Sequence, residues 1–89
     1  MNSQLNEDFL ACFAKLPNAV KEQARKNYRL WKQDLHYSSL QFKRVHTKEK
    51  IHSVRVGRGW RALGLIEGDT ITWFWIGSHA EYDKLISQL

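Results

Sequence analysis

The fold is decided by two neighbouring stretches, residues 53–63 (SVRVGRGWRAL) and residues 70–82 (TITWFWIGSHAEY). Polar and apolar side chains alternate along both, and the second is rich in aromatic and β-branched residues. This pattern is typical of half-buried β-strands. Short turns are predicted at Gly57–Gly59 and Glu67–Asp69. We therefore expect an antiparallel meander of three strands, at 51–56, 60–66 and 70–76.

The same alternation predicts which side chains share a face of the meander. Six apolar residues are expected to pack under the helices: Val54, Val56, Leu63, Leu65, Phe74 and Ile76. Ser53 and Arg55 would face the opposite side, together with Trp73 and Trp75. The two tryptophans have two open interpretations, because they could stack on bases or form a second small cluster under the N-terminal segment.

A helix is expected directly after the last strand. Ser78 and Glu81 have the spacing of a capping box, so Ser78 is the predicted N-cap and His79 the first helical residue. The helix then carries an apolar stripe of Tyr82, Leu85, Ile86 and Leu89.

The first half of the chain shows helical signals. Asn6 is a predicted N-cap, and Pro17 marks the end of the segment that follows it. A second helix is expected from about 18 to 33, because Val20, Ala24, Tyr28 and Trp31 line one face. A strand at 40–43 follows. The predicted fold is thus α+β: an N-terminal helical hairpin packed on a small antiparallel sheet of about four strands, with a short C-terminal helix, as one domain over residues 1–89.

The chain carries a net charge of +5, and its charges are unevenly distributed. Thirteen of the fourteen Lys and Arg residues lie between Lys15 and Arg61, with only three of the nine acids. Such a basic block indicates a polyanionic partner, or an acidic protein that mimics one. A single cysteine, no signal-peptide pattern and no apolar run of membrane-spanning length favour a cytoplasmic protein without a membrane partner.

Three arginines surround the first turn of the meander: Arg55, Arg58 and Arg61. Guanidinium groups can hold a scissile phosphate and stabilise the charge that develops when it is attacked. Arg55 and Arg61 are the candidates for that role, while Arg58 can also simply sit in the turn. Alternatively, these arginines only keep a basic protein soluble.

His79 is a candidate for proton transfer, because imidazole changes its charge near neutral pH. The alternative is a histidine that only makes local hydrogen bonds at the helix start. Tyr82, one turn later, could stack on a base or orient a phosphate, or it could simply belong to the apolar stripe.

Further basic residues flank the loop before the meander and could bind backbone phosphates: Lys43, Arg44, Lys48 and Lys50. For each of them, ordinary surface charge is the alternative. His36, His46 and His52 lack a spacing that would bind zinc with Cys12, so we expect no metal and no other cofactor.

Four segments in this order resemble the RelE/ParE superfamily of bacterial toxins, above all its RelE-type branch of plasmid-stabilisation proteins. They are residues 40–43 (LQFK), 53–56 (SVRV), 59–63 (GWRAL) and 75–85 (WIGSHAEYDKL). The resemblance covers nearly the whole chain. Members of the family usually open with a strand, for which only Asn2–Leu5 are available here.

The resemblance implies a metal-free endoribonuclease that inhibits translation by cleaving mRNA in the ribosomal A site and is neutralised by a cognate antitoxin. In such enzymes the 2′-hydroxyl attacks the adjacent phosphate. By this likeness, Arg55 matches a basic strand residue of the active site and Arg61 a phosphate-stabilising arginine. His79 matches the place of a proton donor, and Tyr82 lies near that of a terminal aromatic residue.

The chain also departs from the family. Ser53 stands where better-studied members have a second lysine, and no carboxylate is clearly placed as a general base. Two other functions therefore stay open: a ParE-like poison of DNA gyrase, and a degenerate toxin that only binds antitoxin or nucleic acid. The pairing of His79 with Arg61 favours the nuclease, because a blocking protein needs no proton-transfer residue.

Overall fold

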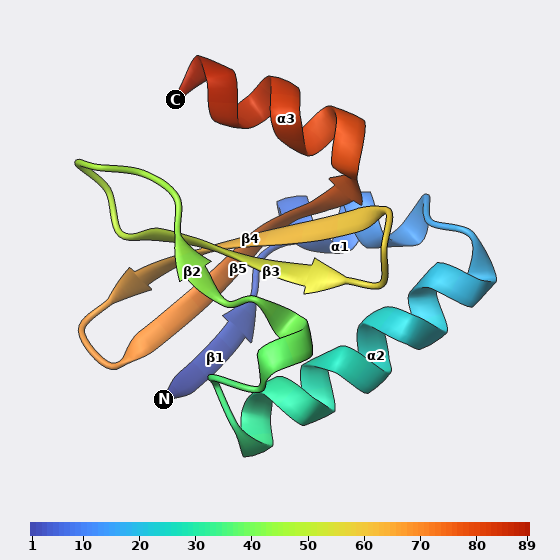
Figure 1. The fold of residues 1–89 in the computed structure, drawn as a ribbon, viewed down its shortest axis with the longest axis horizontal. Coiled ribbons are helices and arrows are strands. Elements are labelled where there is room, and N and C mark those ends of the chain that lie inside the picture. Colours follow the sequence, from blue (N-terminus) through green and yellow to red (C-terminus); the bar gives the residue numbers. More distant parts are fainter.

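A five-stranded sheet forms the centre of the molecule, with two helices on one face and a third on the other (Figure 1). The structure is a computed structural model and describes all residues from 1 to 89. Its elements are β1 (Asn2–Leu5), α1 (Glu7–Ala14), α2 (Asn18–Gln33), the 3₁₀ turn η1 (Ser38–Leu40), β2 (Lys43–Arg44), β3 (Ile51–Val56), β4 (Trp60–Glu67), β5 (Thr70–Ser78) and α3 (His79–Gln88). None of the helices is both long and apolar enough to cross a membrane.

The sheet has the order β1-β5-β4-β3-β2, and β1 runs parallel to β5 while all other neighbours are antiparallel. The predicted α+β class and the meander are confirmed, with five strands in place of about four. The fifth strand is β1, the short N-terminal segment, which pairs Asn2 with Thr70 and Leu5 with Trp73. The chain therefore does open with a strand.

The strand expected at 40–43 is wrong. Leu40 ends the 3₁₀ turn, Gln41 has a left-handed φ of 48°, and only Lys43–Arg44 pair with β3. Leu40 is fully buried, and Phe42 packs against the same core beneath α2. The alternation of these two apolar residues therefore reflects a looped segment anchored at two points and not a pleated strand.

The predicted helix boundaries are confirmed. Asn6 accepts a hydrogen bond from the backbone N–H of Phe9, which caps α1, and Pro17 precedes α2 at Asn18. Ser78 and Glu81 form the expected capping box at the start of α3. Each signal acts within four residues, which is why it is readable from sequence.

Two apolar cores lie on opposite faces of the sheet. The larger lies beneath α1 and α2 and contains Phe9, Leu16, Ala24, Trp31, Leu40, Val54, Val56, Ala62, Ile71, Trp73 and Ile76. The smaller lies beneath α3 and contains Ile51, Leu63 and Tyr82, with Leu65, Phe74, Trp75, Leu85 and Ile86 packed against it. The sheet thus separates two layers, and α3 stabilises only the smaller one.

The predicted faces of the meander are partly wrong. Val54, Val56 and Ile76 do pack under α1 and α2, but Leu63, Leu65 and Phe74 face α3. One reason is the register of the hairpin, in which Val54 lies opposite Ala62 and not opposite Leu63. Residues directly opposite each other share a face, so the whole of β4 is displaced by one residue from the expected assignment.

A β-bulge accounts for the other errors. Leu63 pairs with Trp75 whereas Gly64 pairs with Trp73, so Phe74 is an extra residue and the alternation of β5 changes there. Trp73 consequently lies in the larger core, edge-on to Trp31, and cannot share the face of Arg55. Trp75 packs against the smaller core beneath α3, so the two tryptophans do not form one cluster under the N-terminal segment. Gly64 permits this packing, since a Cβ there would lie 2.7 Å from the Ile71 side chain.

Candidate phosphate-binding site

Arg55 and Arg61 form a direct cross-strand pair between β3 and β4. Both side chains lie on the α3 face, because Arg55 has the same parity as Ser53, whose hydroxyl contacts Tyr82 of α3. The hairpin thus brings together the two arginines that the sequence singled out. Both are half-buried, which keeps their donors accessible while limiting how far they can move.

The carbonyls of the β3–β4 turn hold both guanidinium groups in place. Arg55 Nε donates to the carbonyl of Gly57 (3.2 Å), and an Arg61 terminal nitrogen donates to the carbonyl of Trp60 (2.8 Å). A longer contact of 3.5 Å joins the same Arg61 nitrogen to the carbonyl of Arg58. Gly57 permits the turn with a φ of 64°. The remaining N–H groups of each fork stay available to a ligand.

No carboxylate neutralises these arginines. The only contact between a basic and an acidic side chain in the chain joins His79 and Asp83. Like charges directly opposite each other on a sheet destabilise it, so this pair costs stability in the free protein. Such a local conflict is characteristic of a binding site, and an anion between the two forks would relieve it.

His79 reaches the same turn from α3. Its backbone N–H donates to the carbonyl of Gly59 (2.7 Å), and Ser78 just before it lies opposite Trp60 in the sheet. Four consecutive carbonyls, from residue 57 to residue 60, therefore accept hydrogen bonds from Arg55, Arg61 and His79. The imidazole is 47% exposed, so solvent and a ligand can reach it.

Tyr82 is buried beneath α3, with 9% of its surface exposed. Its hydroxyl donates to the Ser53 hydroxyl (3.3 Å), and its ring centroid lies 5.9 Å from that of His79. It connects α3 to β3 next to Arg55, in a position that suits the apolar stripe. The catalytic role for Tyr82 stays a prediction.

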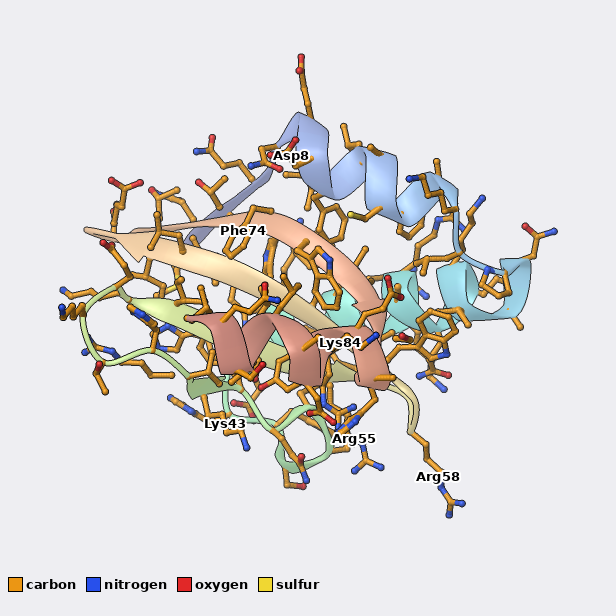
Figure 2. The ribbon with its side chains drawn as sticks, turned by 90° about the horizontal axis from the view of Figure 1, so that it is seen from above. Asp8, Lys43, Arg55, Arg58, Phe74 and Lys84 are labelled. Carbon is orange, nitrogen blue, oxygen red and sulfur yellow. The ribbon has the colours of Figure 1, made fainter.

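The predicted RNA-binding residues divide into three kinds. Lys43 lies opposite Ser53, so it shares the face of Arg55, whereas Arg58 extends away from the end of the hairpin (Figure 2). Arg44 folds back onto its own loop and donates to the carbonyls of His46 (2.8 Å) and Thr47 (2.9 Å). Lys48 and Lys50 are exposed in that loop.

Glu81 holds the start of α3 in shape. Its carboxylate accepts hydrogen bonds from the Ser78 hydroxyl (2.9 Å) and the Ser78 backbone N–H (3.2 Å). These bonds favour the ionised form and lower the pKa of Glu81, with a smaller contribution from Lys84. The capping box therefore fixes the backbone that presents His79.

Asp83 is the residue of the site that sequence reasoning missed. Its Oδ2 lies 3.2 Å from His79 Nδ1. The signal was available, because residues four apart on a helix are neighbours on its surface. No group of three or more His, Cys, Asp or Glu side chains is arranged to hold a metal ion.

An apolar groove lies apart from this site, between α1, α2 and the sheet. It encloses about 210 Å³, and twelve of its fourteen lining residues are hydrophobic. Leu5 and Leu10 line it although they are 41% and 50% exposed. At its edge, the guanidinium carbon of Arg25 and the ammonium of Lys21 lie 5.2 Å and 6.0 Å from the ring centroid of Phe13. The groove is thus apolar inside and basic at the rim.

Known proteins match this chain in family and in fold. The ParE-like toxin domain family matches residues 18–84. A chain of the RelB–RelE antitoxin–toxin complex from Methanococcus jannaschii superposes with a TM-score of 0.75 at 14% identity, over 92% of this chain and 96% of that one. The isolated E. coli RelE toxin gives a TM-score of 0.63 at 13% identity, over 99% and 98% of the two chains. The archaeal RelE–RelB complex from Pyrococcus horikoshii OT3 gives 0.68 at 10% identity, over 86% and 92%. No curated protein matches the sequence.

Proposed function

The chain belongs to the ParE-like toxin family and has the fold of RelE toxins, and on this premise we propose that it is a toxin that cleaves mRNA on the ribosome. The observation that supports this proposal most is the convergence of Arg55, Arg61 and His79 on one turn. Two unpaired guanidinium groups suit a phosphate, and an accessible imidazole on a residue whose backbone contacts the same turn suits proton transfer.

The proposed reaction is an in-line displacement within the RNA backbone. The 2′-oxygen forms a bond to the adjacent phosphorus as its proton passes to water, and the bond from phosphorus to the 5′-oxygen breaks. His79 gives a proton to that leaving oxygen. Arg55 and Arg61 stabilise the negative charge that develops on the phosphoryl oxygens. DNA lacks the 2′-hydroxyl and cannot react in this way.

The basic surface around the site would hold the RNA backbone. Lys43 lies on the face of Arg55, and Lys48, Lys50 and Arg58 are exposed along the neighbouring loops. Charges of this kind carry no sequence information, but they supply affinity that falls as salt rises. We therefore assign them to substrate binding and not to the chemical step.

The antitoxin is the second partner in this proposal. Complexes of RelE with RelB are known for proteins of this fold. The groove between α1 and α2 suits an amphipathic protein segment with acidic flanks, because its interior is apolar and Lys21 and Arg25 border it. Fourteen Lys and Arg side chains without an acidic partner favour such an occupant over a neutral one.

A gyrase poison is the alternative function, and the match to the ParE-like domain is the observation that favours it. A poison of that kind would act by binding and would need no proton-transfer residue. The two functions therefore differ in what His79 should do.

A ribosome assay separates them. Purified ribosomes stalled on a defined mRNA should show A-site cleavage with the wild-type protein, detected by primer extension. His79→Ala should reduce the rate about 100- to 10,000-fold, the usual contribution of a general acid or base, and remove one limb of the pH–rate profile. His36→Ala, a change of an exposed histidine in another loop, is the matched control. Intact mRNA together with gyrase-linked DNA breaks in cells would support the poison instead.

A further inference from the structure

His79 and Asp83 form an isolated pair on the exposed side of α3. The Nδ1 atom of His79 lies 3.2 Å from Oδ2 of Asp83, and the two side chains are 47% and 63% exposed. Every Lys and Arg of the chain lacks such a contact with a carboxylate, including Lys84 beside Asp83. The one acid that contacts a base therefore contacts the candidate proton donor.

The contact brings Nδ1 of the imidazole within hydrogen-bonding distance of a carboxylate oxygen. When Nδ1–H donates to that oxygen, Nε2 lies on the far side of the ring and the neutral ring carries its proton on Nδ1. The ring of Tyr82 is a second neighbour of the imidazole, at a centroid distance of 5.9 Å. Contact with both neighbours limits the rotamers that are open to the imidazole.

The backbone of His79 is restrained as well. Its N–H donates to the carbonyl of Gly59, and Ser78 and Glu81 cap the helix around it. The main chain of His79 is thus held by the turn and the capping box, and its ring has two neighbours in Asp83 and Tyr82. A catalytic imidazole needs its main chain, tautomer and ring orientation to be set.

We propose that Asp83 is a positioning residue, which holds His79 with Nδ1 protonated and Nε2 directed away from the helix for proton transfer. The predicted effect of Asp83 on the cleavage rate rests on the proposed ribonuclease function. The predicted tautomer of His79 does not. In the cleavage step, the Nε2 proton passes to the 5′-oxygen, while the Nδ1 proton stays in the bond to Asp83. Asp83 itself gains and loses no proton.

The structural content is tested by ¹⁵N NMR of the imidazole nitrogens in the isolated full-length protein. At a pH where the ring is neutral, wild-type His79 should show a protonated Nδ1 and an unprotonated Nε2. Asp83→Ala should shift the signals toward the opposite tautomer or a mixture. Asp83→Asn, whose amide oxygen can still accept the bond, should give an intermediate pattern. An unchanged pattern in Asp83→Ala would refute the proposal without reference to any activity.

The kinetic consequence is tested in the ribosome assay. Asp83→Ala should lower kcat about 10- to 100-fold with an unchanged KM, by analogy with the loss of a carboxylate that orients a metal-binding histidine. In a protein that already carries His79→Ala, the change Asp83→Ala should not lower kcat any further. Asp8→Asn makes the same change of charge on α1, apart from α3 (Figure 2), and should leave both readouts unchanged. If Asp83→Ala lowered kcat equally with and without His79→Ala, Asp83 would have another role. If the wild-type protein cut no mRNA, the proposed function would be overturned, but the NMR result on the His79 tautomer would still stand.

Discussion

Among single residues, Arg55 and Arg61 are placed where folding alone would not place them. A cross-strand pair of like charges costs stability, and neither guanidinium group has an acidic partner. Carbonyls of the turn hold both groups but neutralise neither. The site therefore gives up some stability of the free protein for affinity toward an anion.

This trade can be measured with Arg61→Ala. Loss of one electrostatic contact to the reacting phosphate should slow cleavage about a hundredfold, or about 3 kcal/mol of barrier. The same variant should be as stable as wild type or more stable by up to about 1 kcal/mol, because it removes the like-charge pair. Thermal unfolding without RNA and cleavage on ribosomes are the two measurements.

Arg58→Ala is the matched control for that variant. Arg58 belongs to the same turn and carries the same charge, but its side chain extends away from the hairpin (Figure 2). The Arg58→Ala variant should bind RNA somewhat more weakly than wild type, mainly at low salt. If Arg61→Ala stays fully active at equal expression, Arg61 has a structural role only.

At the scale of elements, helix caps and helix limits were predicted correctly from the sequence, because they depend on neighbouring residues. Features that depend on pairing between strands were not. The caps at Asn6 and Ser78 and the limits of α2 depend on neighbours within one or two turns, and they are confirmed. The bulge at Phe74 could not be read, because it depends on the packing of Gly64 against Ile71 and Trp73 across the strands. Once the bulge was missed, the face of Trp73 was assigned wrongly.

The same division applies to the candidate site. The three residues Arg55, Arg61 and His79 were singled out by type and position, and the hairpin and the helix cap bring them to one turn. Their hydrogen bonds to the turn carbonyls could not be predicted, because they depend on side-chain conformation. Asp83 was missed although its spacing from His79 was visible.

The capping box of α3 makes a prediction about pH. Hydrogen bonds from Ser78 lower the pKa of Glu81 in the folded protein below its ordinary value of 4.5. A lowered folded pKa means that the stabilisation is fully present above the unfolded value and is lost as the pH falls through the folded one. The first turn of α3 should therefore loosen in acid, below about pH 4.5.

Glu81→Gln tests this effect, since glutamine can still accept a hydrogen bond but does not titrate. The protection factors of the α3 amides, which compare exchange with its intrinsic rate at each pH, should rise less steeply between acid and neutral pH in the variant than in wild type. The difference should stay below about 1 kcal/mol, the usual contribution of a capping interaction. Glu67→Gln removes the same charge from β4, away from α3, and serves as the control. Equal pH dependence in all three proteins would contradict the assignment.

Over the whole molecule, the two faces of the sheet carry different parts of the proposed function. The α3 face holds Arg55, Arg61 and His79, and the opposite face holds the groove between α1 and α2. The basic residues between Lys15 and Arg61 contribute to both surfaces. An antitoxin bound in the groove would therefore contact a surface that the chemical step does not use, so the two activities should be separable by mutation.

Leu10→Glu should separate them. Leu10 lines the groove from α1 but is 50% exposed, so a charge there should leave the fold intact. Burial of a leucine contributes about 1.5–3 kcal/mol, so its loss, together with repulsion of acidic flanks, should weaken antitoxin binding at least about tenfold. Titration calorimetry with the cognate antitoxin measures the affinity, and ribosomal cleavage should be unchanged.

Ala11→Glu is the control that makes this result specific. It introduces the same charge one residue later on α1, at an exposed position outside the groove lining. It should leave antitoxin affinity within about twofold of wild type, because a single surface charge contributes little. In cells, the Leu10 variant should then arrest growth even when the antitoxin is co-expressed, while the Ala11 variant should be neutralised. Equal neutralisation of both would place the antitoxin elsewhere, and the α3 face would be the next surface to test, since an antitoxin bound there would block the arginines directly.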